Sequence, residues 1–239
     1  MQENNKAGSA ILGVFIFLGL ATLGYFLSNA VINFKMYDRS VTVKGLSEKE
    51  YVADVVIWPI QFAVANSDLA SLYNSIDGQS AKIHEFLEQN GITANEITIA
   101  PPAITDKSAQ QYGNDTQAQF RYTAIQTVTV YSENIDAVRK VMSSLSQLGK
   151  QGIVFTGGNY QSQTEYLFTR LNEVKPEMIE EATTKAREVA QKFATDSQSS
   201  LGKIKKASQG QFSINARDKN NPHIKRIRVV STVEYYLSD

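Results

Sequence analysis

The sequence predicts an α+β fold in which helices pack on a largely antiparallel or mixed β-sheet, preceded by one N-terminal transmembrane helix. Three observations lead to this prediction: a long uncharged apolar run near the N-terminus, several segments with period-two alternation, and three segments with helical periodicity. The predicted order is strand, strand, helix, strand, strand, helix, strand, helix, strand, strand. Because no regular strand–helix–strand series is present, a doubly wound parallel sheet is disfavoured.

The apolar run covers residues 10–34, which are 25 consecutive residues without a formal charge. About 20 helical residues cross the hydrocarbon core of a bilayer, so this segment is long enough to span a membrane once. Tyr25 and Phe34 suit one interface, and Lys6 with the terminal amine favours a cytoplasmic N-terminus. We therefore expect a short cytoplasmic tail at 1–9, a transmembrane anchor and juxtamembrane segment in membrane lipid at 10–34, and an exported domain at 35–239.

A cleaved signal peptide is the alternative interpretation of the same run. Ser28, Asn29 and Ala30 form a small-x-small pattern that signal peptidases recognise, which would make Val31 the mature N-terminus. The uninterrupted apolar part at 10–27 has 18 residues, whereas a signal-peptide core has about 7 to 15. This length favours the anchor, and both interpretations export the domain that follows.

Two strands open the exported domain, at 40–45 and 52–64. In the second strand, alternation places six bulky apolar residues on one buried face: Val52, Val56, Trp58, Ile60, Phe62 and Val64. Asp54 has the same parity, and Pro59, which has no N–H to donate, predicts an edge strand or a bulge. Further strands are expected at 96–100, 121–131 and 164–169, followed by two final strands of which the last lies at 227–237.

Three helices are expected between these strands. The first lies at 69–90 and buries Leu69, Leu72, Tyr73, Ile76, Ile83 and Leu87, and the second lies at 134–148 and buries Ile135, Val138, Met142, Leu145 and Leu148. The third begins near Pro176 and ends at Leu201 and Gly202. Its inward face is small: Ile179, Ala182, Ala186, Val189, Ala190 and Phe193.

Composition excludes several kinds of site. The chain has 239 residues, of which 42% are apolar and 20% are charged, as expected of a folded protein. It contains no Cys, which excludes disulfides, thiolate zinc sites, iron–sulfur clusters and thiol nucleophiles. His84 and His223 are the two histidines, so a His-rich metal site is excluded. No Gly-x-Ser-x-Gly motif is present. We therefore expect no catalytic residues, no metal and no cofactor.

Net charge is zero overall but unevenly distributed. Residues 201–230 contain eight basic side chains against Asp218 alone, a balance of +7. A basic segment of this kind can face phosphates, anionic lipid or an acidic partner, or can simply solvate strands and protect an edge. No stacking aromatics are interleaved, which disfavours nucleic acid. Lys225, Arg226 and Arg228 are the candidate surface for assembly or for a partner, and we expect a homo-oligomer.

Carboxylates are the remaining candidates for chemistry. Glu177, Glu180, Glu181 and Glu188 crowd the third helix, where Glu181 is spaced to pair with Lys185 on a solvent face. Asp54 on the bulky side of a strand needs a partner or a bulge that lets it reach solvent. A structural role for Asp54 is favoured over catalysis, because no second acid or base can be assigned to it.

Four segments carry a resemblance to a known family. They are Val41 to Gly45 in the opening strand, Asp54 entering a long apolar strand, Phe120 to Ala124 leading into Val128 to Val130, and the Ala-rich stretch from Ala182 to the Leu201–Gly202 turn. This pattern resembles the SIMPL-domain family over about residues 39–238. The sequence departs from the family at Leu46 and Ser47, where Gly is usual, and at Ala53, where Pro commonly precedes the Asp.

The resemblance implies a bacterial cell-envelope protein, exported or anchored, without established enzymatic activity. Some members of the family are linked to oxidative-stress tolerance and some assemble into rings. We therefore expect a single-pass protein of the bacterial inner membrane whose C-terminal domain lies in the periplasm or outside the cell, acting by self-assembly or by binding an unknown envelope protein. The alternative is an extracytoplasmic enzyme for a small molecule or polymer, using Asp54, Glu carboxylates and the polar 103–118 loop as a lid.

Overall fold

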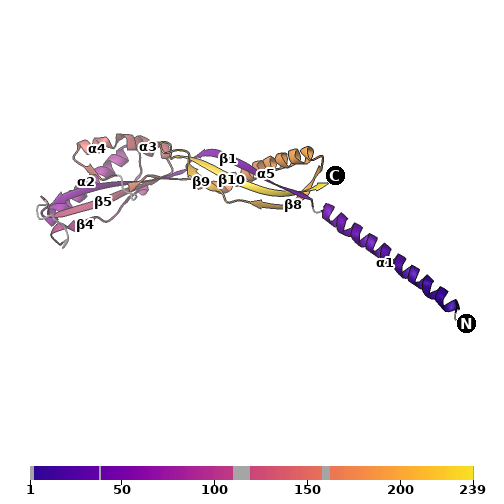
Figure 1. The fold of residues 1–239 in the computed structure, drawn as a ribbon. Coiled ribbons are helices and arrows are strands. Elements are labelled where there is room, and N and C mark those ends of the chain that lie inside the picture. The colour runs from indigo at the N-terminus through magenta and orange to yellow at the C-terminus, as the bar shows by residue number, and fades with distance from the viewer. Residues whose placement is uncertain (1–2, 38, 110–118, 158–161, 239) are drawn as a thin grey trace. The chain divides into compact units, whose positions relative to one another are not determined.

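The fold is α+β, as predicted, and the structure, a computed structural model, describes residues 3–37, 39–109, 119–157 and 162–238. The chain divides into two compact units. Unit 1 comprises Met1–Glu48, Lys175–Ser213 and Arg228–Asp239, and unit 2 comprises Lys49–Val174 and Ile214–Ile227. Figure 1 labels most of the helices and strands. In chain order they are α1 (Glu3–Tyr37), β1 (Ser40–Val52), β2 (Val55–Asn66), α2 (Leu69–Gln89), β3 (Ile97–Ile99), β4 (Ala103–Asp106), β5 (Tyr122–Ser132), α3 (Ile135–Ser144), α4 (Ser146–Lys150), β6 (Val154–Phe155), β7 (Glu165–Leu167), α5 (Leu171–Asp196), β8 (Ser200–Gln209), β9 (Ser213–Ala216) and β10 (Ile224–Ser238).

Unit 2 is built on a sheet with the order β3-β5-β2-β6, in which β4 also pairs with β5 and β7 with β2. All of these pairs are antiparallel. The predicted alternation in β2 is confirmed, because Val56, Trp58, Ile60, Phe62 and Val64 are buried in one core. Helix α2 contributes four of its predicted apolar residues to that core: Leu72, Ile76, Ile83 and Leu87.

Three predictions for unit 2 are wrong in detail. Leu69 and Tyr73 are exposed, because they lie beside the buried stripe of α2 and not on it. Val52 belongs to β1 and is 56% exposed. Strand β2 is not an edge strand, because β5 pairs along one side of it and β6 and β7 along the other. Pro59 is accommodated between residues 55–57, which pair with β7, and residues 62–63, which pair with β6.

Two other segments of unit 2 differ from their predicted form. The helix expected at 134–148 is divided at Leu145 into α3 and α4, although its apolar stripe still packs on the core. Residues 103–106 of the predicted loop form β4 and residues 107–109 form a short 3-10 helix, while 110–118 lie outside the described residues. An ion pair of 2.8 Å between Arg121 Nη2 and Asp106 Oδ2 links the two sides of this segment.

Unit 1 contains the sheet β1-β10-β8, with β9 paired to β10, and helix α5 (Figure 1). The buried residues of α5 follow one stripe at a spacing of four: Met178, Ala182, Ala186, Ala190 and Ala194. Ala186 and Ala190 share a core cluster with Val43 of β1 and with Val233 and Tyr235 of β10. Small side chains let the helix axis approach the sheet closely, as the predicted Ala-rich face indicated.

Gly45 of β1 lies where this approach is closest. A Cβ at Gly45 would lie 1.8 Å from the carbonyl oxygen of Ala182 and 2.5 Å from the backbone nitrogen of Ala186. Both neighbours are helix backbone and cannot rotate away as a flexible side chain could. The close packing of α5 on β1 therefore requires both glycine at position 45 and the small residues of the Ala stripe.

The predicted bounds and inward face of α5 are partly wrong. The helix begins at Leu171, five residues before Pro176, and Leu201 and Gly202 lie in β8 and do not end the helix. Val189 is exposed, and Phe193 is 55% exposed. The helix turns its Ala stripe to the sheet and leaves this larger apolar pair on the outside.

Helix α1 contains the predicted apolar segment. Within the described residues, the 19 residues Leu12–Ala30 have a mean hydropathy of 1.7 and are long and apolar enough to cross a membrane. A signal sequence near the N-terminus can have the same properties.

Candidate site at the β1–β2 junction

The junction between β1 and β2 is held by backbone hydrogen bonds from two distant segments of unit 2. The Ala53 N–H donates to the His223 carbonyl oxygen at 2.8 Å, and the Asp54 N–H donates to the Leu167 carbonyl oxygen at 2.9 Å. Two aromatic contacts flank them, between the rings of Tyr51 and Phe168 and between those of Tyr166 and His223. The strand predicted at 52–64 therefore begins only at Val55, and the junction residues Ala53 and Asp54 lie before it.

The Asp54 carboxylate is hydrogen-bonded by Thr169 and Arg170. Its Oδ1 accepts the Thr169 N–H at 2.8 Å, and its Oδ2 accepts Thr169 Oγ1 at 3.0 Å. The Arg170 backbone N–H and Nε also donate to Oδ2, at 3.3 and 3.2 Å. Burial raises the pKa of Asp54, but the Thr169 and Arg170 hydrogen bonds outweigh it and the pKa is lowered overall. Asp54 is therefore an ionised carboxylate that fixes the turn between β7 and α5.

Asp54→Asn should destabilise unit 2 by about 1.5 to 3 kcal/mol at neutral pH, the range for hydrogen bonds to a charged group. Because the folded-state pKa is lowered, this stabilisation is complete above the unfolded pKa near 3.8 and is lost as pH falls through the folded value. The difference between wild type and variant in urea unfolding should thus be constant near neutrality and shrink below pH 4. Asp196→Asn, at the exposed end of α5, is the matched control and should change little. An equal effect of both substitutions would contradict the role given to Asp54.

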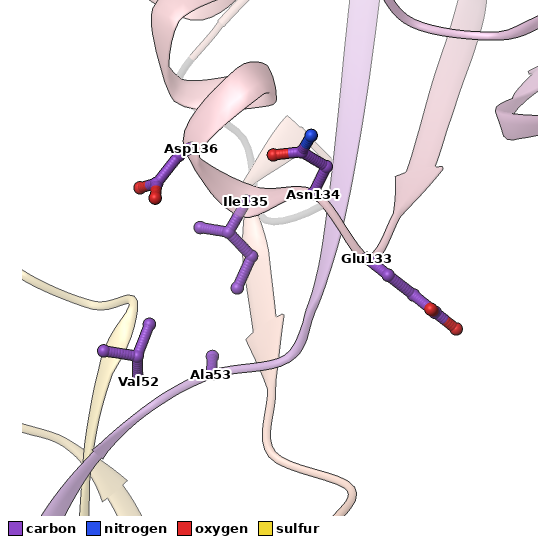
Figure 2. Close-up of a pocket in the computed structure, with 6 residues that line it drawn as sticks. All are labelled: Val52, Ala53, Glu133, Asn134, Ile135 and Asp136. Atoms are coloured by element: carbon purple, nitrogen blue, oxygen red, sulfur yellow. The ribbon is translucent and has the colours of Figure 1, made fainter.

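A hollow of about 420 Å³ opens beside this junction, at the start of α3. Figure 2 shows Glu133, Asn134, Ile135 and Asp136 on one side of it and Val52 and Ala53 on the other. The Asn134 side chain caps α3 by accepting the Ala137 N–H at 3.1 Å. Asp54 does not line this hollow. This hollow therefore does not bring Asp54 together with the carboxylates of Glu133 and Asp136.

The two histidines lie in different surroundings. His84 is on α2, half-buried, with Nδ1 3.4 Å from Glu88 Oε2. His223 is buried, with 9% of its surface exposed, although it follows the polar residues Asn220 and Asn221 in the sequence. Burial lowers the pKa of His223, and Arg139 and Arg217 lower it further, against the opposing charges of Asp136 and Asp218.

The basic residues proposed as an assembly surface have partners within the chain. Arg226 Nη2 lies 3.6 Å from Glu50 Oε1, and Arg228 Nε lies 3.8 Å from Glu48 Oε2. Burial lowers the pKa of Lys225, while the charge of Glu165 acts to raise it. The positive balance of 201–230 is therefore partly offset by two acids of β1. Alternation along β1 could have suggested this, since Glu48 and Glu50 share one face.

The glutamates of α5 behave as a solvent face. Glu181 Oε1 pairs with Lys185 Nζ at 2.6 Å, as predicted, and Glu181 Oε2 accepts the Ser47 hydroxyl at 2.7 Å. Among the described residues, no group of three His, Asp or Glu side chains is placed to hold a metal ion.

Comparison with known proteins places the chain among its relatives. Residues 41–232 match the SIMPL family, described as a protein of unknown function (DUF541). The chain belongs to the SIMPL family. The match includes the opening strand with Gly45, the Asp54 junction and the Ala stripe of α5, which are the segments that carried the resemblance in the sequence.

A curated SIMPL relative and one solved structure extend the comparison. The relative is the uncharacterized protein YggE of Edwardsiella ictaluri (strain 93-146), 26% identical over 162 residues, or 67% of this chain. The matched region spans 60% of that relative's length. The solved structure is titled "Crystal structure of putative glycine cleavage system transcriptional repressor", and the match covers 83% of each chain at 10% identity with a TM-score of 0.20.

Proposed function

We propose that this SIMPL protein is a non-enzymatic component of the bacterial cell envelope. In this proposal α1 anchors it in the inner membrane as a single span, and the rest of the chain lies in the periplasm or outside the cell. It acts by self-assembly or by binding an envelope protein, in tolerance of oxidative stress. The observation that carries the proposal is the 19-residue apolar stretch Leu12–Ala30 ahead of a polar α+β region.

The length of α1 supports a membrane span. At 1.5 Å per residue, 19 helical residues measure about 28 Å, close to the hydrocarbon thickness of about 30 Å. The side chains that the structure describes along this stretch include large exposed apolar residues, among them Phe15, Phe17 and Phe26. Lipid is the environment that would cover such a surface.

The mature protein should therefore retain residues 1–30 and resist extraction by alkaline carbonate. Fractionation of cells followed by N-terminal sequencing of the membrane-bound protein tests this. A soluble mature form beginning at Val31 would contradict the anchor and favour the signal-peptide alternative.

The state of Asp54 supports the non-enzymatic part of the proposal. Both of its oxygens accept hydrogen bonds from Thr169, Oδ2 also accepts from Arg170, and its side chain is 16% exposed. A general acid needs a raised pKa and an open approach to substrate, and Asp54 has a lowered pKa instead. The alternative of an enzyme built on Asp54 is correspondingly weaker.

Self-association has two kinds of support. The first is uneven charge, since β8 and β10 carry most of the basic segment while α5 exposes Glu180 and Glu188. The second is the exposed apolar pair of Val189 and Phe193 on α5. Complementary patches on one subunit can meet head to tail and close into a ring.

If Arg226 and Arg228 contribute to assembly, their replacement by Gln should lower the oligomer mass at low salt. Light scattering of the full chain in detergent measures this. Lys82→Gln with Lys140→Gln removes the same charge from exposed positions outside the basic segment and is the matched control, expected to leave the mass unchanged. Added salt should also lower the mass, because exposed charges are screened over about 10 Å at 0.1 M. A monomer under every condition would contradict self-assembly. An oligomer whose mass does not change with salt would contradict the electrostatic basis and favour apolar contacts through Val189 and Phe193.

A further inference from the structure

Two polar side chains interrupt the apolar contact between α2 and the sheet of unit 2. On α2, Ser80 occupies a place in the stripe that otherwise buries Leu72, Ile76, Ile83 and Leu87. On β5, Gln126 occupies a place in the alternation that otherwise buries Ala124, Val128 and Val130. Ser80 is 6% exposed and Gln126 is 7% exposed. Apolar residues at both positions would be the ordinary way to fill a helix–sheet contact.

The hydrogen bonds of these two residues are incomplete. Gln126 Nε2 donates to the Ala100 carbonyl oxygen at 2.9 Å, which orients Oε1 the other way. Gln126 Oε1 and Ser80 Oγ are both buried without a hydrogen-bond partner among the described residues. A serine in a helix can donate to the carbonyl four residues earlier, as Ser75 does to Ser71 at 2.8 Å, but Ser80 does not. Buried polar atoms left unpaired are costly, so a ligand that satisfies them gains by it.

Both residues line a hollow of about 430 Å³, which is within the size range of small-molecule sites. Asp77 and Glu85 of α2 line it as well, and Ile99 of β3 provides an apolar wall. Eight residues separate the two acids along the helix, or about 12 Å at 1.5 Å per residue. Ionised carboxylates accept hydrogen bonds and donate none, and the same is true of the Gln126 amide oxygen Oε1. His84 also lines the hollow, with Nδ1 3.4 Å from Glu88 Oε2. A ligand with N–H donors, positive charge and an apolar chain would complement the acids, the Gln126 oxygen and Ile99.

We propose that the hollow between α2, β3 and β5 binds a linear aliphatic polyamine. One ammonium group donates to Gln126 Oε1 and Ser80 Oγ at the floor, and the others lie beside Asp77 and Glu85. The methylene segments pack against Ile99. Spermidine, a triamine with two spacers of methylene groups, has the required alternation of charge and apolar chain.

Isothermal titration calorimetry tests the proposal, with spermidine titrated into the full-length protein in detergent at fixed ionic strength. Wild type should show saturable binding of one spermidine per chain. Gln126→Leu should weaken the affinity about tenfold or more, because a hydrogen bond to a charged group is lost. Asp77→Asn with Glu85→Gln should weaken it severalfold, as expected for exposed ion pairs. Glu133→Gln, an acid beside the other hollow of unit 2, is the matched control and should bind as wild type does.

Stability measurements separate a ligand site from a packing defect. Ser80→Ala with Gln126→Leu should leave unfolding in urea unchanged or make it harder, while abolishing the extra stability that spermidine gives to wild type. Unaltered spermidine binding by this double variant would overturn the proposal. So would the absence of saturable heat, an equal loss in Glu133→Gln, or displacement of spermidine by equimolar magnesium.

Discussion

Gly45→Ala should lower the free energy of unfolding of unit 1 by about 3 kcal/mol or more, the upper part of the range for overpacked cores. The added methyl carbon would lie 1.8 Å from the Ala182 carbonyl oxygen. Relief requires α5 to move off the sheet, which opens the cluster around Val43, Ala186 and Val233. Hydrogen exchange should reveal this as lost protection of the β1 and β10 amides in the full chain.

Gly78→Ala is the control for this prediction. Gly78 lies within α2, and nothing lies within 4 Å of a Cβ placed there. Alanine is favoured over glycine in a helix by about 1 kcal/mol, so this variant should be more stable than wild type. Opposite signs for the same chemical change are the expected result. A harmless Gly45→Ala would mean that α5 does not pack on the sheet as closely as described.

Phe62→Ala should destabilise unit 2 by about 3 to 5 kcal/mol, since Phe62 is fully buried at the centre of β2. The loss combines the transfer of the ring from the core with the cavity left behind. Trp58, the single tryptophan, lies on the same face of β2 and reports unfolding of unit 2 in urea by its fluorescence. The urea concentration at the midpoint of this fluorescence transition should fall sharply in Phe62→Ala.

Phe193→Ala makes the same change at an exposed position on α5. It should alter stability by less than about 0.5 kcal/mol, as surface substitutions usually do. It should also leave the Trp58 transition unmoved. If Phe193→Ala costs as much as Phe62→Ala, then the exposed apolar pair is covered by a contact within or between chains.

Periodicity predicted the core of unit 2 well but could not predict the junction. The alternation from Val56 to Val64 depends only on neighbours in the sequence, and it is confirmed. Asp54 has the same parity, so alternation alone assigns it to the strand. Its actual position depends on Thr169, 115 residues further along, and no local pattern carries that information.

Helical periodicity was similarly ambiguous on α5. Two adjacent stripes share the spacing, one through Ala186 and Ala190 and one through Val189 and Phe193. Hydrophobicity favours the larger residues, yet the Ala stripe is buried because Gly45 leaves room for backbone contact there. The pairing of Arg226 with Glu50 and of Arg228 with Glu48 likewise depends on which strands are neighbours, which the charge balance of 201–230 could not reveal.

The order of strands in unit 1 has a consequence for biosynthesis. β10, the last strand along the chain, occupies the middle of the β1-β10-β8 sheet, and β1, the first, lies beside it. Neither neighbour can complete its ladder until residues 224–238 have left the ribosome and, in an exported protein, the translocation channel. Nascent unit 1 must therefore wait with two unpaired strand edges, which are open to pairing with another chain until β10 arrives. A premature stop codon before β10 would remove the centre of this sheet and not its margin.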